Sequence, residues 1–219
     1  MANSREPVRL ALRQLWTDHI QWTRGYIIDA VEGATISAHV ADAAYSQIGD
    51  LATTLDAIKP KSATDAAAVR LLKNQEDIGN AVVPYYGADA GAALTGLLKD
   101  HIVIAVGLVE NAKSGDQAAF ATNDQKWTDN IREIAHFLSG ANPAWPENDV
   151  FDLLNQHLNL TKGEVVARLQ KDWAADVKAS DDLLAEAMVI ADTLYDGLVA
   201  QFPDRFDSTN ARQTAGAVA

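Results

Sequence analysis

LLKDHIVIAVG, residues 97–107, is the stretch that decides the fold, because two other parts of the chain repeat its pattern. The pattern returns as LWTDHIQWTRG at residues 15–25 and as LLNQHLNLTKG at residues 153–163. Each copy has a histidine at its fifth position and a glycine six residues later. Apolar residues recur three and four positions apart in these segments, which is typical of the buried face of an α-helix.

A second segment recurs between these copies and keeps the same period. His101 and His157 are 56 residues apart, and 56 residues also separate Asn130 from both Asn74 and Glu186. Because two independent segments share one period, the sequence predicts three repeats of a hairpin of two helices. The copies of the second segment are NQEDIG at residues 74–79, NIREIA at residues 130–135 and EAMVIA at residues 186–191.

The first repeat is longer than the other two. His19 and His101 are 82 residues apart rather than 56, so this repeat carries 26 extra residues. The extra residues lie between positions 20 and 73, and we expect them to form an inserted helix at about residues 34–60.

The fold class predicted for the whole chain is all-α. Proline-free stretches rich in Ala, Leu, Asp, Gln and Lys favour helices, and no sustained alternation of period two indicates strands. We therefore expect an antiparallel helical bundle of three repeated αα-hairpins plus the inserted helix, in one domain over residues 1–206 with a flexible tail at residues 207–219. The predicted helices span residues 8–32, 36–58, 64–83, 88–113, 116–139, 147–178 and 181–202.

The composition excludes several classes of function. The 219 residues include no cysteine, which rules out disulfides, zinc ribbons, iron–sulfur clusters and a cysteine nucleophile. A formal net charge of −12 opposes binding to nucleic acid and to anionic membranes. We find no secretory signal and no run of about 18 apolar residues, so we expect an acidic, soluble, cytoplasmic protein. The sequence leaves open whether the chain forms a homo-oligomer.

The repeated positions define a candidate site. The three repeated histidines lie among Leu, Ile and Trp at core spacing, so we expect them to point into the bundle and to need polar partners there. Related hairpins would bring these imidazoles, two asparagines and three carboxylates to one level, with two tryptophans beside them. The proposed metal ligands are His19, His101, His157, Asp77 and Glu133. The proposed ligand-binding or supporting residues are Asn74, Asn130, Glu186, His136, Trp16 and Trp127.

Several interpretations of this polar layer remain open. Imidazoles and carboxylates are the usual ligands of zinc, iron, manganese or copper in a bundle without cysteine. The same groups could hold a small organic molecule, and they could also only specify how the helices pack. An enzyme would further need an open coordination position and a pocket that water can reach. The string EIAH at residues 133–136 matches one part of a ferritin-like di-metal motif, but the other hairpins lack its counterparts.

The repeated glycines at positions 25, 107 and 163 lie in the middle of predicted helices, where glycine is unfavourable. We interpret them mainly as places where a neighbouring helix or side chain approaches closely. Room for a ligand beside each histidine is the alternative.

Five strings together resemble a family of small bacterial all-helical proteins. Some members of that family carry the labels glycosyltransferase or acetylglutamate kinase. The resemblance covers about residues 8–33 and 66–206, and it implies an all-helical fold without implying an activity. Neither label fits this chain, which has no nucleotide-binding loop and no alternating βα pattern. The strings are LWTDHIQWTR (15–24), RLLKNQEDIG (70–79), LLKDHI (97–102), EIAHFL (133–138) and QFP (201–203).

Overall fold

A computed structural model describes residues 5–32 and 62–206, and every described element is a helix. The predicted all-α class is therefore confirmed. The predicted inserted helix and the predicted C-terminal tail lie outside the described residues. The helices are α1 (Arg5–Val31), α4 (Ala63–Tyr86), α5 (Ala88–Ser114), α6 (Gln117–Ala141), α7 (Glu147–Leu169), α8 (Trp173–Gln201) and the short α9 (Pro203–Phe206).

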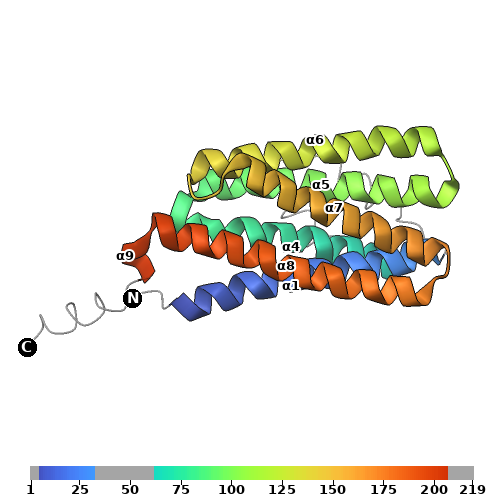
Figure 1. Ribbon diagram of the computed structural model, residues 1–219, viewed down its shortest axis with the longest axis horizontal. Helices are drawn as coiled ribbons and strands as arrows, with labels where there is room; N and C mark the ends of the chain where they lie inside the picture. The colour runs from blue at the N-terminus through green and yellow to red at the C-terminus, as the bar shows by residue number, and fades with distance from the viewer. Residues whose placement is uncertain (1–4, 33–61, 207–219) are drawn as a thin grey trace, which may run out of the picture.

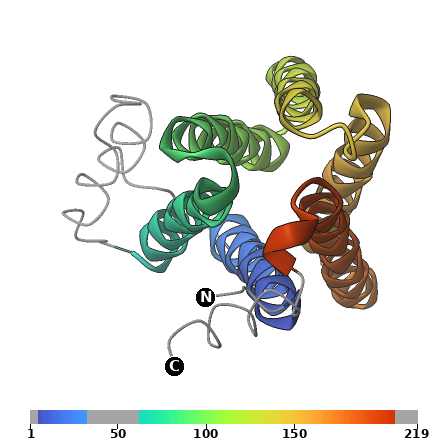
Figure 2. The ribbon, with the colours of Figure 1, turned by 90° about the vertical axis from the view of Figure 1, so that its left-hand side faces the viewer.

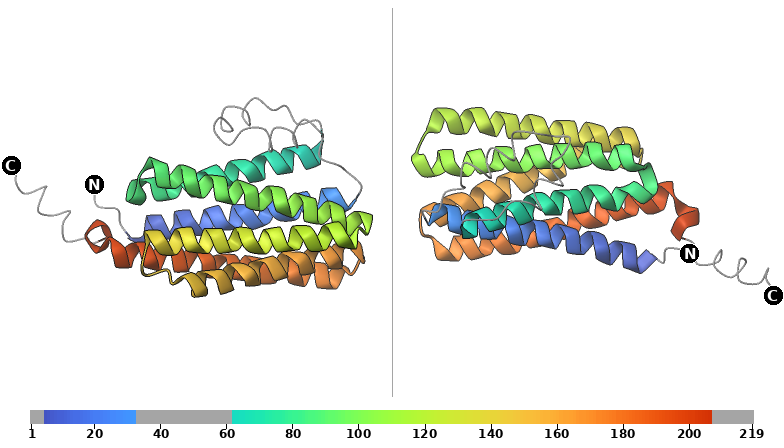
Figure 3. Two further views of the ribbon diagram at one scale, coloured as in Figure 1. Left: turned by 90° about the horizontal axis from the view of Figure 1, so that it is seen from above. Right: turned by 180° about the vertical axis from the view of Figure 1, so that it is seen from behind.

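The six long helices lie side by side along the length of the molecule (Figures 1 and 3). Among the described helices, α1 packs with α4, α5 with α6 and α7 with α8. Each pair also packs against the next, and α8 returns to α1, so the order of contacts closes into a ring (Figure 2). Helices α1, α5 and α7, which carry the three histidine segments, also contact one another. These contacts bring the repeated histidine positions to the inside of the bundle.

The helix boundaries follow local signals, and two predicted boundaries are wrong. Helix α4 begins at its predicted place, where Ser62 accepts a hydrogen bond from the backbone N–H of Asp65. It then continues through Pro84 and ends at Gly87, whose positive φ of 88° few other residues adopt. Pro84 lies in the last turn of the helix, where the loss of one backbone N–H disrupts little of the ladder.

The break between α7 and α8 lies earlier in the chain than the sequence indicates. A helix was expected to run to residue 178, but α7 ends at Leu169. Lys171 has a φ of 58°, which turns the chain, and the Asp172 side chain then accepts a hydrogen bond from the Ala175 N–H at 3.1 Å. An aspartate N-cap therefore starts α8 without any glycine or proline at the break.

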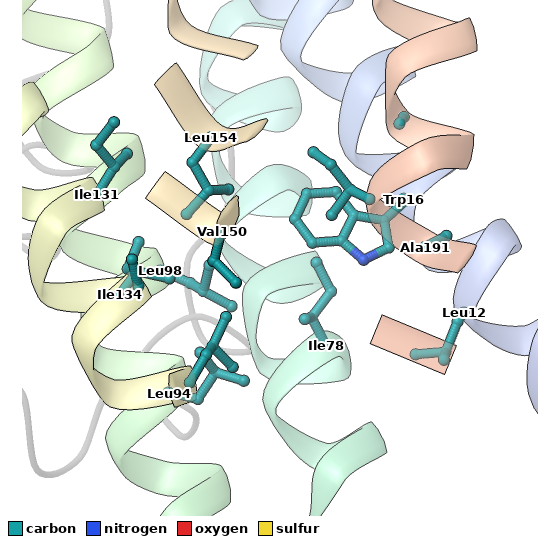
Figure 4. Close-up of a cluster of buried hydrophobic side chains, with 14 of the residues drawn as sticks. Leu12, Trp16, Ile78, Leu94, Leu98, Ile131, Ile134, Val150, Leu154 and Ala191 are labelled. Carbon is teal, nitrogen blue, oxygen red and sulfur yellow. The ribbon is translucent and has the colours of Figure 1, made fainter. Parts of the chain in front are cut away.

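Two clusters of buried apolar side chains fill the bundle. The larger one includes Leu12 and Trp16 of α1, Leu94 and Leu98 of α5, and Leu154 of α7 (Figure 4). Its side chains also line a pocket with about 690 Å³ of empty space, counted together with the open solvent at its mouth. The members of the smaller cluster are Tyr26, Ile27 and Ala30 of α1, Ala67, Ala68, Leu71 and Leu72 of α4, Ile102 and Val109 of α5, and Val165 of α7.

Only one of the three repeated glycines marks the close approach that we expect. A Cβ atom added at Gly107 would lie 2.9 Å from Asn123 Nδ2, so a neighbouring side chain does approach closely there. A Cβ atom added at Gly25 or Gly163 would meet nothing within 4 Å, so the close-packing interpretation is wrong at these two positions. Tight contact also occurs where Gly79 of α4 crosses Gly91 of α5, with the added Cβ of Gly79 only 2.7 Å from the Gly91 carbonyl oxygen.

Helix α5 is unusually apolar for a helix of this bundle. It has 27 residues and an 18-residue window of mean hydropathy 1.7, so by length and composition alone it is long and apolar enough to cross a membrane. It contains no uninterrupted run of about 18 apolar residues, because Lys99, Asp100 and His101 lie in its middle. The helix packs between α4 and α6 in this structure, and 33% of the window is buried there.

Candidate functional site

The three repeated histidines meet in the interior of the bundle. The ring centroid of His157 lies 5.6 Å from that of His19 and 6.3 Å from that of His101. All three side chains are buried. Helices α1, α5 and α7 each contribute one of them, and the mutual contacts of these helices place the rings together. We call these three residues the histidine cluster.

Each histidine is held through its Nδ1 atom by a polar residue of the neighbouring helix in its own hairpin. His101 Nδ1 lies 2.9 Å from Asn130 Oδ1, and Asn130 Nδ2 donates to the backbone carbonyl of Leu97 at 3.0 Å. That second bond fixes the orientation of the amide, because only the nitrogen can donate to a carbonyl. The oxygen therefore faces the imidazole, and His101 carries its proton on Nδ1.

The first hairpin repeats part of this arrangement. Asn74 Nδ2 donates to the carbonyl of Leu15 at 3.0 Å, and Leu15 precedes His19 by four residues just as Leu97 precedes His101. His19 Nδ1 lies 3.2 Å from the Nε2 atom of Gln75, a fully buried neighbour of Asn74. This correspondence supports the predicted repeat.

The third hairpin replaces the amide with a carboxylate. His157 Nδ1 lies 3.1 Å from Glu186 Oε2, and both side chains are buried. A carboxylate can only accept, so this pair places the His157 proton on Nδ1 when Glu186 is ionised. Among the hydrogen bonds of the described residues, none involves Nε2 of any of the three histidines.

Two tryptophans lie against the cluster, as their sequence positions indicate. The Trp127 ring centroid lies 5.1 Å from that of His101, and its Nε1 donates to the His101 carbonyl at 3.1 Å. The Trp16 ring meets His19 edge-on at 5.6 Å. The indoles shield the imidazoles from solvent on these sides.

Burial keeps two imidazoles uncharged. Loss of hydration, followed by the neighbouring His157 and His101 rings, holds the pKa of His19 well below its ordinary value. The same loss of hydration, with a smaller contribution from His157, lowers the pKa of His101 to about 3. Both rings are thus neutral at physiological pH, and a neutral imidazole can accept a hydrogen bond or bind a metal.

The structure places three other predicted site residues away from the cluster. Asp77 forms an ion pair with Arg70 at 3.8 Å, and Glu133 is exposed. Three residues along a helix leave two side chains about 60° apart, so a buried asparagine does not bring the following carboxylate inward with it. His136 is also exposed, with its Nδ1 atom 3.0 Å from Glu147. No hydrogen bond among the described residues joins Asp77, Glu133 or His136 to the histidine cluster.

A metal centre is not assembled in this arrangement. Within residues 5–32 and 62–206, no group of three or more His, Asp or Glu side chains has the geometry to hold a metal ion.

The histidine cluster borders an apolar pocket, which the sequence did not indicate. The pocket has about 630 Å³ of empty space, counted out to its mouth. Residues of α1, α4, α5, α6 and α7 line it, and small side chains such as Ala105 and Ala112 leave room along α5. The half-buried Phe120 and the exposed Val166 lie at its outer side. Its walls are almost entirely apolar apart from a few polar side chains near the histidines.

Two polar side chains that line this pocket have no partner among the described residues. They are the hydroxyl groups of Thr23 and Tyr26, and both oxygens are buried. Burial, with a smaller contribution from Glu110, raises the pKa of Tyr26, so its phenol keeps its proton. Thr23 and Tyr26 follow His19 by four and seven residues, which places all three on one face of α1. This helical spacing is the one signal in the sequence that points to these two hydroxyl groups.

Comparison of the chain with protein-family models, with curated proteins and with solved structures found no match, so the resemblance stated from the sequence stays a prediction.

Proposed function

We propose that this protein binds a small, largely apolar molecule in the pocket beside the histidine cluster. The observation that carries the proposal is the combination of apolar walls with buried hydroxyl groups at Thr23 and Tyr26 that have no hydrogen-bond partner among the described residues. A buried polar group without a hydrogen bond costs about 1–3 kcal/mol, and a bound molecule or water that completes it removes this cost. A concave apolar pocket with a few convergent polar groups is the usual form of a small-molecule site.

The polar end of the pocket agrees with this function. Its floor is made of three side chains that are buried and hydrogen-bonded, so the polar end of the site is already positioned before a molecule binds.

Binding of N-phenyl-1-naphthylamine, an uncharged fluorescent probe, tests the proposal. We expect a saturable rise in fluorescence at a stoichiometry of one. The variant Ala105→Phe, which fills the half-buried outer part of the pocket, should weaken binding at least tenfold. Ala93→Phe makes the same change at an exposed position of α5 away from the pocket, so it should bind as the unaltered protein does. Equal binding by the two variants, or no saturable binding at all, would contradict the proposal.

A divalent metal ion, of zinc, iron, manganese or copper, is a second candidate for the same cluster. The observation that favours it is the contact of Asn130 with Nδ1 of His101 and of Glu186 with Nδ1 of His157. Metal-binding histidines are commonly held in this way, with the other ring nitrogen left for the metal. The Nε2 atoms would have to approach one another to share an ion.

Elemental analysis of protein purified without a polyhistidine tag separates the two candidates. One equivalent of metal in the unaltered protein, reduced to background in His101→Gln, would favour the metal. A substoichiometric metal content that His101→Gln leaves unchanged would exclude it. If the protein binds neither metal nor probe, the histidine cluster serves only to specify how the helices pack.

A further inference from the structure

We infer that the molecule bound in this pocket presents an uncharged hydrogen-bond donor, such as a hydroxyl group, to the histidine cluster and is not a carboxylate. The inference rests on the proposed function and adds the chemistry of the ligand's polar end. It follows from which atoms the cluster offers and from the charge that lies behind them.

The cluster offers an acceptor at His101. The amide of Asn130 places the proton of His101 on Nδ1, and a neutral imidazole with its proton there has a bare lone pair on Nε2. This acceptor lies at the edge of the pocket, and an O–H group can donate to it. His19 offers a donor instead, because the Nε2 atom of Gln75 can only donate toward its Nδ1 atom, which leaves the proton of His19 on Nε2.

The charge around the cluster disfavours an anion. Glu186 is buried directly behind His157, and the chain as a whole has a formal net charge of −12. Lys162 is the one cation among the described residues that line the pocket. It forms an ion pair with Asp124 at 2.9 Å, so its charge is already offset. A carboxylate would enter an apolar pocket without a free counter-charge, at a large cost in lost hydration.

The unpartnered hydroxyl groups complete the match with a hydroxyl ligand. Tyr26 and Thr23 can donate to the oxygen of a ligand whose own proton goes to a histidine. A hydroxyl group is both donor and acceptor, whereas a hydrocarbon would leave these groups and the imidazoles unsatisfied.

A matched series of naphthalene, 2-naphthol and 2-naphthoate tests the inference by competition against the fluorescent probe. The three compounds share one apolar body and differ at a single position. One additional hydrogen bond contributes about 0.5–1.5 kcal/mol, so 2-naphthol should compete roughly three- to tenfold more strongly than naphthalene. The carboxylate should be the weakest of the three. In Glu186→Gln the deficit of 2-naphthoate relative to 2-naphthol should narrow, because an amide, which cannot carry a negative charge, then lies behind His157.

The outcomes distinguish this inference from the proposed function. If the three compounds compete equally, or 2-naphthoate competes best, the pocket binds small molecules but the inferred polar group is wrong. If neither the probe nor any of the three compounds binds, the proposed function fails and the inference fails with it. Because the series uses the unaltered protein, the result does not depend on whether a variant folds.

Discussion

His101 and Asn130 are joined by a 2.9 Å contact between Nδ1 and Oδ1, and the same amide donates to the carbonyl of Leu97. This one side chain therefore fixes both the orientation and the protonation of a buried imidazole. Asn130→Leu keeps the approximate volume but leaves the Nδ1 proton without an acceptor. We expect the free energy of unfolding to fall by about 2 kcal/mol, measured by urea denaturation. Glu133→Gln, on the exposed side of the same helix, should change it by less than about 0.5 kcal/mol. Similar losses in both variants would contradict this role for Asn130.

Stability should depend on pH through His101. Its pKa is about 3 in the folded protein and near 6.5 in the unfolded chain. As the pH falls from about 6.5 toward 3, the unfolded chain gains a proton that folded His101 does not, so the free energy of unfolding decreases in that window. The slope reaches about 1.4 kcal/mol per pH unit. The free energy of unfolding can be measured by urea denaturation between pH 4 and 7.5. Its slope against pH should be smaller by this amount in His101→Gln than in the unaltered protein. His136→Gln, at an exposed histidine, should keep the original slope.

Two glycines should respond in opposite ways to the same substitution. Gly163 is exposed within α7, and an added Cβ meets nothing within 4 Å. Gly163→Ala should therefore stabilise the protein by about 0.5–1 kcal/mol. Gly79→Ala would force its Cβ to within 2.7 Å of the Gly91 carbonyl oxygen and should destabilise the α4–α5 crossing. Thermal unfolding of the two variants, each compared with the unaltered protein, decides the point. A loss of stability in both would mean that Gly163 has a role that the packing does not reveal.

Arg24 should be required for stability because it serves two buried carboxylates. It forms ion pairs with Glu164 and, at 3.0 Å, with Asp176, both of which are nearly inaccessible to solvent. Burial raises the pKa of Glu164 even beside the guanidinium, which indicates how costly the charge is at this position. Removal of one partner from a buried ion pair typically costs about 3–5 kcal/mol. Arg24 is partly exposed, so we expect Arg24→Met to cost about 3 kcal/mol in chemical denaturation, toward the lower end of that range.

The matched control for Arg24 is an exposed ion pair. Arg132→Met removes the partner of Asp129 on the surface of α6, where both side chains are more than half exposed, and should cost less than about 1 kcal/mol. Adding Glu164→Gln to Arg24→Met should recover part of the lost stability, since the unpaired buried charge is then absent. Equal costs for Arg24→Met and Arg132→Met would show that the buried carboxylates are not charged.

The sequence predicted the helices and the meeting of the histidines because both depend on spacing. A helical period of three and four residues and a common interval of 56 residues can be read from the sequence whatever the details of side-chain packing are. The break before α8 was missed because it depends on a single aspartate cap at Asp172 and on Lys171, in a stretch without glycine or proline. Local hydrogen bonds of this kind change the spacing of apolar residues very little, so that spacing does not reveal them.

The candidate site was predicted in part for a similar reason. Spacing placed Asn130 and Glu186 opposite the histidines, but it could not separate them from Asp77 and Glu133, whose positions differ by only a fraction of a helical turn. The pocket depends on how small side chains from five helices combine in space. The sequence of a single segment does not determine the volume of the pocket, which can be seen only in the assembled bundle.

The return of α8 to α1 has a consequence for how the chain folds. Arg9 and Arg13 of α1 both hold Asp192 of α8, and the first of these contacts joins residues 183 positions apart. Contacts within each hairpin join much nearer residues, so they close smaller loops at lower entropic cost. We therefore expect the hairpins to form early and the packing of α8 against α1 to form last. Because all three imidazoles come together only when α1 and α8 pack together, the histidine cluster and its pocket would be among the final parts of the molecule to become ordered.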